Sequence, residues 1–254
     1  TVGATFYVIG VGLLYMMTGT LNMVDMAERL QPVLMTRTVL AGFGFLAVGI
    51  SLKLALFPLH LWLPNAYAYA PSVVTAFLAA TATKVSIYVF VRFFYNIFGA
   101  QYTFSMLHLE WFLVPLALAG VFVASLVAVF QSNIKRLLAY SSIAQVGYMM
   151  LGVGLNSLTG LTATLAHLFN HAITKCALFL AMGSIVLRLG SCELENLRGL
   201  GKRMPVTMAA FVAGGLSLIG VPLTAGFISK WYLVLGALER GWYAVAGLVL
   251  IASL

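Results

Sequence analysis

Apolar runs long enough to cross a lipid bilayer recur along the whole chain, and this feature limits the folds that it can adopt. We predict spans at residues 3–23, 39–63, 73–98, 111–132, 139–158, 161–187 and 206–238, with an eighth beginning near residue 242. A segment inside lipid must satisfy its backbone hydrogen bonds internally, so each run is expected to be helical. The sequence therefore predicts an all-α fold, a polytopic transmembrane helical bundle.

The composition supports a membrane protein and argues against a nucleic-acid-binding one. Of the 254 residues, 62% are hydrophobic and only 8% are charged, whereas soluble domains carry about 25% charged residues. The net charge of +8 comes mostly from basic residues between the apolar runs, where they act as orientation signals. Cys176 and Cys192 fit no metal-ligand spacing. We expect no bound nucleic acid, metal or cofactor.

Both ends of the sequence fall within apolar runs. The chain begins at Thr1 without an initiator methionine and stops at Leu254 inside "GWYAVAGLVLIASL". We interpret residues 1–254 as a single transmembrane domain that is truncated at both ends. The expected location is a bacterial inner membrane or an organellar energy-transducing membrane.

Prolines and glycines are expected to break two of the spans. The second span contains Pro58 and has Pro64 at its end, and the seventh contains Pro222 within "GLSLIGVPLTAGF". Non-helical backbone at membrane depth persists only where protein or water satisfies its polar groups. Two broken helices are typical of transporters.

Basic residues in the connections predict the orientation of the bundle. The 133–138 connection and the 188–205 connection fall on one face, which we expect to be cytoplasmic because both are basic. Their basic residues are Lys135, Arg136, Arg188, Arg198, Lys202 and Arg203. The 24–38 connection falls on the opposite face although it holds Arg29 and Arg37, which runs against the rule.

Four lysines lie well inside apolar runs, namely Lys53, Lys84, Lys175 and Lys230. A lysine at the centre of a membrane helix costs about 2.5–3.5 kcal/mol on insertion scales, so we expect these side chains to face the bundle interior. Burial disfavours the charged form, so a buried lysine can exchange a proton near neutral pH, as a proton relay requires. The alternative is that a long stem carries the charge to the membrane surface.

The segment "HLFNHAITKCALFL" places His167, His171 and Lys175 at positions i, i+4 and i+8, along one face of a helix. Two histidines and a lysine on an inward face can pass protons through hydrogen bonds. The alternative is that each histidine is a structural hydrogen-bond donor. No acidic residue lies inside a predicted span, since Glu110 and Glu239 lie at span ends.

Four stretches carry a family resemblance: "LKLALFPLHLWLPNAYAYAPS", "NIKRLLAYSSIAQVGYMMLG", "HLFNHAITKCALFLAMGSI" and "GLSLIGVPLTAGFISKWYL". They resemble the antiporter-like proton-translocating membrane subunits of respiratory complex I. They also resemble the relatives of these subunits in Mrp-type sodium/proton antiporters and membrane-bound hydrogenases. "TKVS" around Lys84 and "GVPLTAGFISKWYL" are slightly more similar to the Mrp branch, and within it to the D-type subunits.

The resemblance implies a role for each matching residue. Lys53 corresponds to the proton-input lysine and Lys84 to the lysine that links input to a central axis. His167 and His171 match the histidine helix, and Lys230 matches the ionisable residue of proton exit. In the family a glutamate on an upstream helix pairs with the input lysine, and that region precedes Thr1. Relatives often read "LPDAH" where this chain has "LPNAY" at 63–67.

The resemblance also implies the function and the partners. It implies an ion-translocating subunit that moves protons, alone or together with Na⁺ or K⁺. The subunit would sit beside other membrane subunits in a multisubunit cation/proton antiporter or an NADH-quinone oxidoreductase-like complex. Such a subunit is not an enzyme by itself, although it can be the pumping part of an NADH:quinone oxidoreductase-type translocase. Two alternatives remain open: a secondary transporter of a small solute, and a non-conducting structural subunit.

Overall fold

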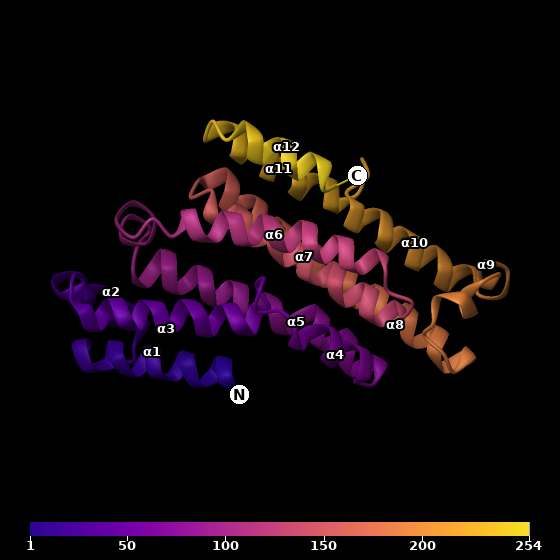
Figure 1. The fold of residues 1–254 in the computed structure, drawn as a ribbon, viewed down its shortest axis with the longest axis horizontal. Coiled ribbons are helices and arrows are strands. Elements are labelled where there is room, and N and C mark those ends of the chain that lie inside the picture. The colour runs from indigo at the N-terminus through magenta and orange to yellow at the C-terminus, as the bar shows by residue number, and fades with distance from the viewer. Residues whose placement is uncertain (254) are drawn as a thin grey trace.

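The chain folds into a bundle of long, roughly antiparallel helices (Figure 1). The structure is a computed structural model that describes residues 1–253. Its helices are α1 (Val2–Thr18), α2 (Met23–Leu30), η1 (Gln31–Val33), α3 (Arg37–Leu54), α4 (Trp62–Tyr69), α5 (Ser72–Val91), η2 (Arg92–Ile97), η3 (Gln101–Met106), α6 (Glu110–Val129), α7 (Ile134–Gly154), α8 (Leu158–Leu189), η4 (Leu194–Leu197), α9 (Leu200–Arg203), α10 (Pro205–Ile219), α11 (Ala225–Glu239) and α12 (Tyr243–Ile251). These described residues form no β-strand, so the prediction of an all-α bundle is confirmed.

Within residues 1–253, five helices are long and apolar enough to cross a membrane: α3, α5 together with the π-helical turn η2, α6, α7 and α8. A sixth span results if α1 and the α2–η1 segment, which are bent by 61° relative to each other, are counted as one. The seventh predicted span corresponds to α10 and α11, which are separated by a break. The protein is therefore an integral membrane protein with broken helices.

The first break separates α3 from α4. Helix α3 ends at Leu54 because Ala55 adopts a left-handed conformation with φ of 61°. Pro58 lies in the non-helical stretch 55–61, and Pro64 lies in the first turn of α4, where a missing N–H is tolerated. Helix α4 continues to Tyr69, so the predicted end of this span at residue 63 is wrong.

The second break separates α10 from α11. Gly220 ends α10 with φ of 88°, a conformation that favours glycine. Pro222 follows, and Thr224 then caps α11 by accepting a hydrogen bond from the backbone N–H of Phe227 at 3.4 Å. Both predicted helix breaks are present.

The two basic connections pack against each other at one end of the bundle. Asn133 forms an antiparallel bridge with Glu193, and the N–H of Ile134 donates to the Cys192 carbonyl at 2.9 Å. Helix α2 lies at the opposite end (Figure 1). The structure therefore places the 133–138 and 188–205 connections on one face, as predicted.

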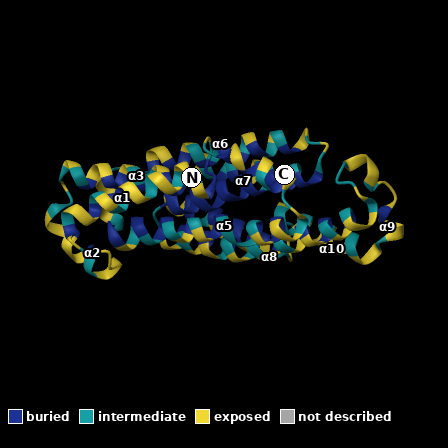
Figure 2. Ribbon diagram, turned by 90° about the horizontal axis from the view of Figure 1, so that it is seen from below, coloured by how far each residue is buried: buried dark blue, intermediate teal, exposed yellow. Residues whose placement is uncertain are grey.

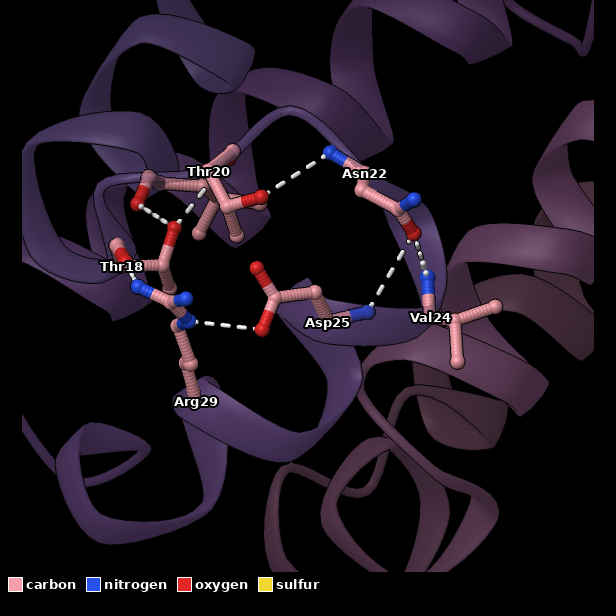
Figure 3. A network of polar contacts seen from close by, with 7 residues as sticks. Thr18, Thr20, Asn22, Val24, Asp25 and Arg29 are labelled. Atoms are coloured by element: carbon pink, nitrogen blue, oxygen red, sulfur yellow. Dashed lines mark hydrogen bonds and ion pairs between the residues drawn. The ribbon is translucent and has the colours of Figure 1, made fainter.

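Arg29, on the opposite face, has local partners that account for its position. Its Nε donates to Asp25 Oδ1 at 2.7 Å, and its guanidinium donates to the Thr18 carbonyl at 3.3 Å (Figure 3). Asn22 caps α2 by accepting from the N–H of Val24 at 2.9 Å. The arginine that runs against the orientation rule thus ties the end of α1 to α2, and its charge is balanced there.

Helix α8 is the central helix of the bundle, since it packs against α5, α7, α10 and α11. Helix α7 is buried without interruption from Ser142 to Gly154, and buried residues concentrate along it in Figure 2. Small residues allow this close packing. A Cβ at Gly152 would lie 2.7 Å from the Gly160 carbonyl oxygen, so these glycines let α7 and α8 approach backbone to backbone.

Gly226 provides a test of the second break. A Cβ at this position would overlap the carbonyl oxygen of Ser217, so the two halves of the broken helix approach each other here. We expect Gly226→Ala to destabilise the full-length protein by about 1–3 kcal/mol, as overpacking typically does. Thermal unfolding in detergent measures this. Gly215→Ala on α10 is the control because that site faces open space; equal stability of the two variants would contradict the packing.

Candidate functional site

A row of buried lysine and histidine side chains follows the inner face of α8. Five of the six predicted site residues are buried, and they come from three helices. Lys84 lies on α5, His167, His171 and Lys175 lie on α8, and Lys230 lies on α11. The packing of α5 and α11 against α8 brings these side chains into the bundle interior and away from lipid.

The two histidines stack along α8, one turn apart. Their ring centroids are 6.1 Å apart and the planes are inclined by 12°. His167 is hydrogen-bonded at both nitrogens: Nδ1 lies 2.7 Å from Ser229 Oγ, and Nε2 lies 2.7 Å from Gln145 Oε1. Among the described residues, neither nitrogen of the buried His171 has a hydrogen-bond partner. The row thus contains one fully bonded imidazole and one that needs further partners.

Lys175 is fully buried, and its ammonium group stays inside the bundle. Its Nζ donates to the Leu138 carbonyl of α7 at 2.7 Å and also contacts Ser141 Oγ. This side chain therefore does not extend to the membrane surface. Lys84 is 3% exposed, and its Nζ contacts the Ala79 carbonyl of its own helix.

Lys230 occupies the second helix break. Its Nζ donates to the Ile219 carbonyl at 2.9 Å and lies 4.5 Å from the ring centroid of Tyr148. Gln145 Nε2 donates to the neighbouring Leu218 carbonyl at 3.4 Å. Two backbone carbonyls at the end of α10 therefore accept hydrogen bonds from side chains of α11 and α7.

Lys53 lies apart from the buried row. Its side chain is exposed, which differs from the expected inward position, and its Nζ lies 5.3 Å from the ring centroid of Tyr7. It borders a cleft of about 780 Å³ that is also lined by residues 1–4, Trp62 and Ser86. The Leu52 carbonyl beside the first break accepts from Trp62 Nε1 at 2.8 Å. A backbone carbonyl at the break therefore accepts from an ammonium group at the second break and from an indole at the first.

The cations of the row have no carboxylate partners within residues 1–253. Ion pairs in this part of the chain join only Arg29 to Asp25, at 2.7 Å, and His108 to Glu110, at 3.5 Å. Carbonyls, hydroxyls and an aromatic ring contact the lysines instead. Over the same residues, no three His, Cys, Asp or Glu side chains come together in a way that could hold a metal ion.

Sequence reasoning missed several polar residues of the site. Gln145 and Ser229 contact His167, and a glutamine inside the apolar run "SSIAQVGYMMLG" was a usable signal for the first of them. Lys135 was interpreted only as an orientation signal, yet it is buried and donates to the Ala70 carbonyl at 3.0 Å. Its neighbour Arg136 donates to Asn65 Oδ1 at 2.9 Å. These two cations attach the end of α4 to α7.

The same arrangement of helices occurs in known proteins. The sequence profile described as "NADH:quinone oxidoreductase/Mrp antiporter, TM" matches residues 1–254. The chain belongs to this family. It is 44% identical over 256 residues to the NADH-quinone oxidoreductase subunit N of Desulforudis audaxviator, covering 100% of this chain and 50% of that protein. It is 34% identical to the D-type Na⁺/H⁺ antiporter subunit of Alkalihalophilus pseudofirmus, covering 98% and 50%.

A solved structure of the NADH:quinone oxidoreductase/Mrp antiporter family has the same fold. A chain of the Mrp complex from Dietzia superposes with a TM-score of 0.89 at 33% identity, covering 99% of this chain and 46% of that chain. The identity to the oxidoreductase relative exceeds that to the antiporter relative, so the slight leaning of the sequence motifs toward the Mrp branch does not assign this chain to it. The chain spans about half the length of the curated relatives that it matches.

The contact between Lys230 and the second break predicts a structural cost that is separate from transport. We expect Lys230→Met to destabilise the full-length protein by about 1–3 kcal/mol, because a partly buried hydrogen bond from a charged group to the Ile219 carbonyl is lost. Thermal unfolding in detergent measures the change. Lys202→Met removes an exposed lysine from the 190–204 connection and serves as the control. An unchanged melting temperature for Lys230→Met would refute the role of Lys230 at the break.

Proposed function

We propose that this chain is part of an ion-translocating membrane subunit that moves protons along Lys53, Lys84, His171, His167 and Lys230. The observation that carries this proposal is the buried row on α5, α8 and α11, which places titratable groups from three helices inside a membrane bundle. The chain spans about half the length of the curated relatives that it matches, so the proton-transport activity of the whole protein is itself proposed.

The chemistry of the row supports proton movement. A lysine and an imidazole can each hold one exchangeable proton or release it, and neighbouring groups influence each other strongly because their surroundings screen charge poorly. Adding a proton at Lys84 therefore makes protonation of the next group less favourable, which drives the charge onward. Neither nitrogen of His171 has a hydrogen-bond partner among residues 1–253, so both stay available to exchange a proton with a neighbouring group.

Lys53 and Lys175 have different places in the proposal. Lys53 would take up protons, a role that rests on the family resemblance and on its position beside the first break. Lys175 lies one turn beyond His171, toward the end of α8 that carries the 190–204 connection. It would extend the row in that direction, with Ser141 as its neighbour on α7.

The relatives suggest the partners. Their names describe an NADH-quinone oxidoreductase subunit and a Na⁺/H⁺ antiporter subunit. We propose that this chain likewise works beside other membrane subunits of a hetero-oligomeric complex, which supply the driving energy. Residues 1–254 would form one transmembrane unit, and the transported ion would be H⁺ alone or H⁺ exchanged for Na⁺ or K⁺.

Lys84→Ala tests the proposal. In the full-length protein, assembled with its partner subunits in vesicles, we expect proton transport to fall at least tenfold while assembly is unchanged, because the row loses a proton carrier. Quenching of a pH-sensitive dye measures transport, and native gel electrophoresis measures assembly. Lys202→Ala, which removes an exposed lysine, is expected to leave both unchanged.

Two other outcomes would favour the alternatives. If Lys84→Ala prevents assembly while Lys202→Ala does not, the lysine has a structural role and the chain is better explained as a scaffold. If Lys84→Ala leaves proton transport intact and the vesicles take up a small solute saturably, the chain is better explained as a solute transporter.

A further inference from the structure

His167 is held at both ring nitrogens by neutral side chains from two other helices. Gln145 on α7 faces Nε2, and Ser229 on α11 faces Nδ1, each at 2.7 Å. All three side chains are buried. Over residues 1–253 the ring makes no other hydrogen bond, so these two contacts determine where the imidazole can carry a proton.

The hydrogen-bond inventory assigns the proton of neutral His167 to Nε2. Gln145 Nε2 donates to the Leu218 carbonyl at 3.4 Å, which orients the amide so that its Oε1 faces the imidazole. The opposite amide orientation would place two oxygens against each other. A carbonyl oxygen only accepts, so His167 Nε2 must carry a hydrogen, and Nδ1 is then the acceptor in the neutral ring.

Ser229 can bond to Nδ1 in both protonation states without moving a heavy atom. Its Oγ lies 2.7 Å from Nδ1 and also 3.1 Å from the Gly226 carbonyl. Opposite a neutral ring, the hydroxyl donates to Nδ1. Opposite an imidazolium, Nδ1–H donates to Oγ, and the hydroxyl hydrogen turns to the Gly226 carbonyl, because a hydroxyl both donates and accepts.

We propose that Ser229 and Gln145 are positioning residues that make Nδ1 of His167 the single atom at which this histidine gains and loses its proton. Gln145 holds the other proton on Nε2, and the Ser229 hydroxyl turns between Nδ1 and the Gly226 carbonyl at each cycle. Loading moves a proton from a protonated lysine of the row to Nδ1, which breaks one N–H bond of the ammonium group and forms one on the ring. Unloading passes that proton to the next basic group, and the serine keeps its O–H bond throughout. This inference rests on the proposed function, since it assumes that protons pass through His167.

The inference connects the state of the histidine to the second helix break. Leu218 lies at the end of α10, and Gly226 lies in the first turn of α11. Gln145 therefore bonds to the backbone before the break, and Ser229 bonds to the backbone after it. The charged groups near the ring are Lys84 of α5 and Lys230 of α11. Tyr148 of α7 and His171 of the same helix contact it through their rings, and none of these four residues hydrogen-bonds to it. The hydrogen bond between Ser229 and Nδ1 is thus the one whose donor and acceptor exchange roles when the ring gains a proton.

The decisive experiment combines spectroscopy and transport in the full-length protein with its partner subunits. With ¹⁵N-labelled histidine, the solid-state NMR difference between wild type and His167→Asn isolates the signals of His167. We expect a neutral imidazole protonated at Nε2, and we expect Gln145→Met to add the Nδ1-protonated form. Neutral His167 protonated at Nδ1 in the wild type would overturn the inference, whatever the variants do.

The transport measurement uses serine variants. We expect Ser229→Ala to slow proton transport about tenfold or more, because the imidazolium loses its acceptor, and Ser229→Thr to restore it by keeping the hydroxyl. Ser184→Ala is the matched control, since that serine on α8 bonds only to its own helix. If His167→Asn stops transport but Ser229→Ala does not slow it, the inference fails alone. If His167→Asn has no effect, the proposed path through His167 fails as well.

Discussion

A helix that breaks inside a membrane releases backbone carbonyls, and the rest of this structure depends on how they are bonded. Water is scarce at that depth, so the protein must supply the donors. At the second break the donors are Lys230 and Gln145, and at the first break one donor is the indole of Trp62. Two of these donors, Lys230 and Gln145, also belong to the candidate site, so the second break and the buried row share side chains.

The buried row concentrates basic groups without acids to balance them. Carbonyl oxygens, the hydroxyl of Ser141 and the face of Tyr148 contact the ammonium groups in place of carboxylates. Dipolar partners stabilise a cation less than a carboxylate does, so the charged and neutral forms of each lysine lie closer in free energy. A row built in this way favours exchange of protons over permanent ion pairing, which suits a relay better than a structural network.

Much of the architecture could be predicted from the sequence, because the bilayer imposes length and polarity rules. Apolar runs located the spans, and Pro58 and Pro222 located the breaks. Helical spacing put His167, His171 and Lys175 on one buried face. The end of α4 was misplaced because a proline in the first turn of a helix resembles one that ends a helix.

Other parts of the site were beyond sequence reasoning. Whether a lysine beside a break meets a carbonyl depends on which neighbour reaches that carbonyl first, and Trp62 does so near Lys53. The roles of Ser229 and Gln145 arise from contacts between α7, α8 and α11, and no spacing within one helix encodes such contacts. A charged residue in an apolar sequence is a strong signal of a functional site, whereas a serine or a glutamine is only a weak one.

The attachment of α4 to α7 has a consequence for how the protein tolerates acid. Arg136 donates to the amide of Asn65, and Lys135 donates to a backbone carbonyl. Neither acceptor gains a proton near pH 4, where a carboxylate in the same place would lose its charge. Acidification of the adjoining compartment therefore leaves the hydrogen bonds between α4 and α7 intact. Helix α4 stays attached to α7 while the proton concentration around it changes.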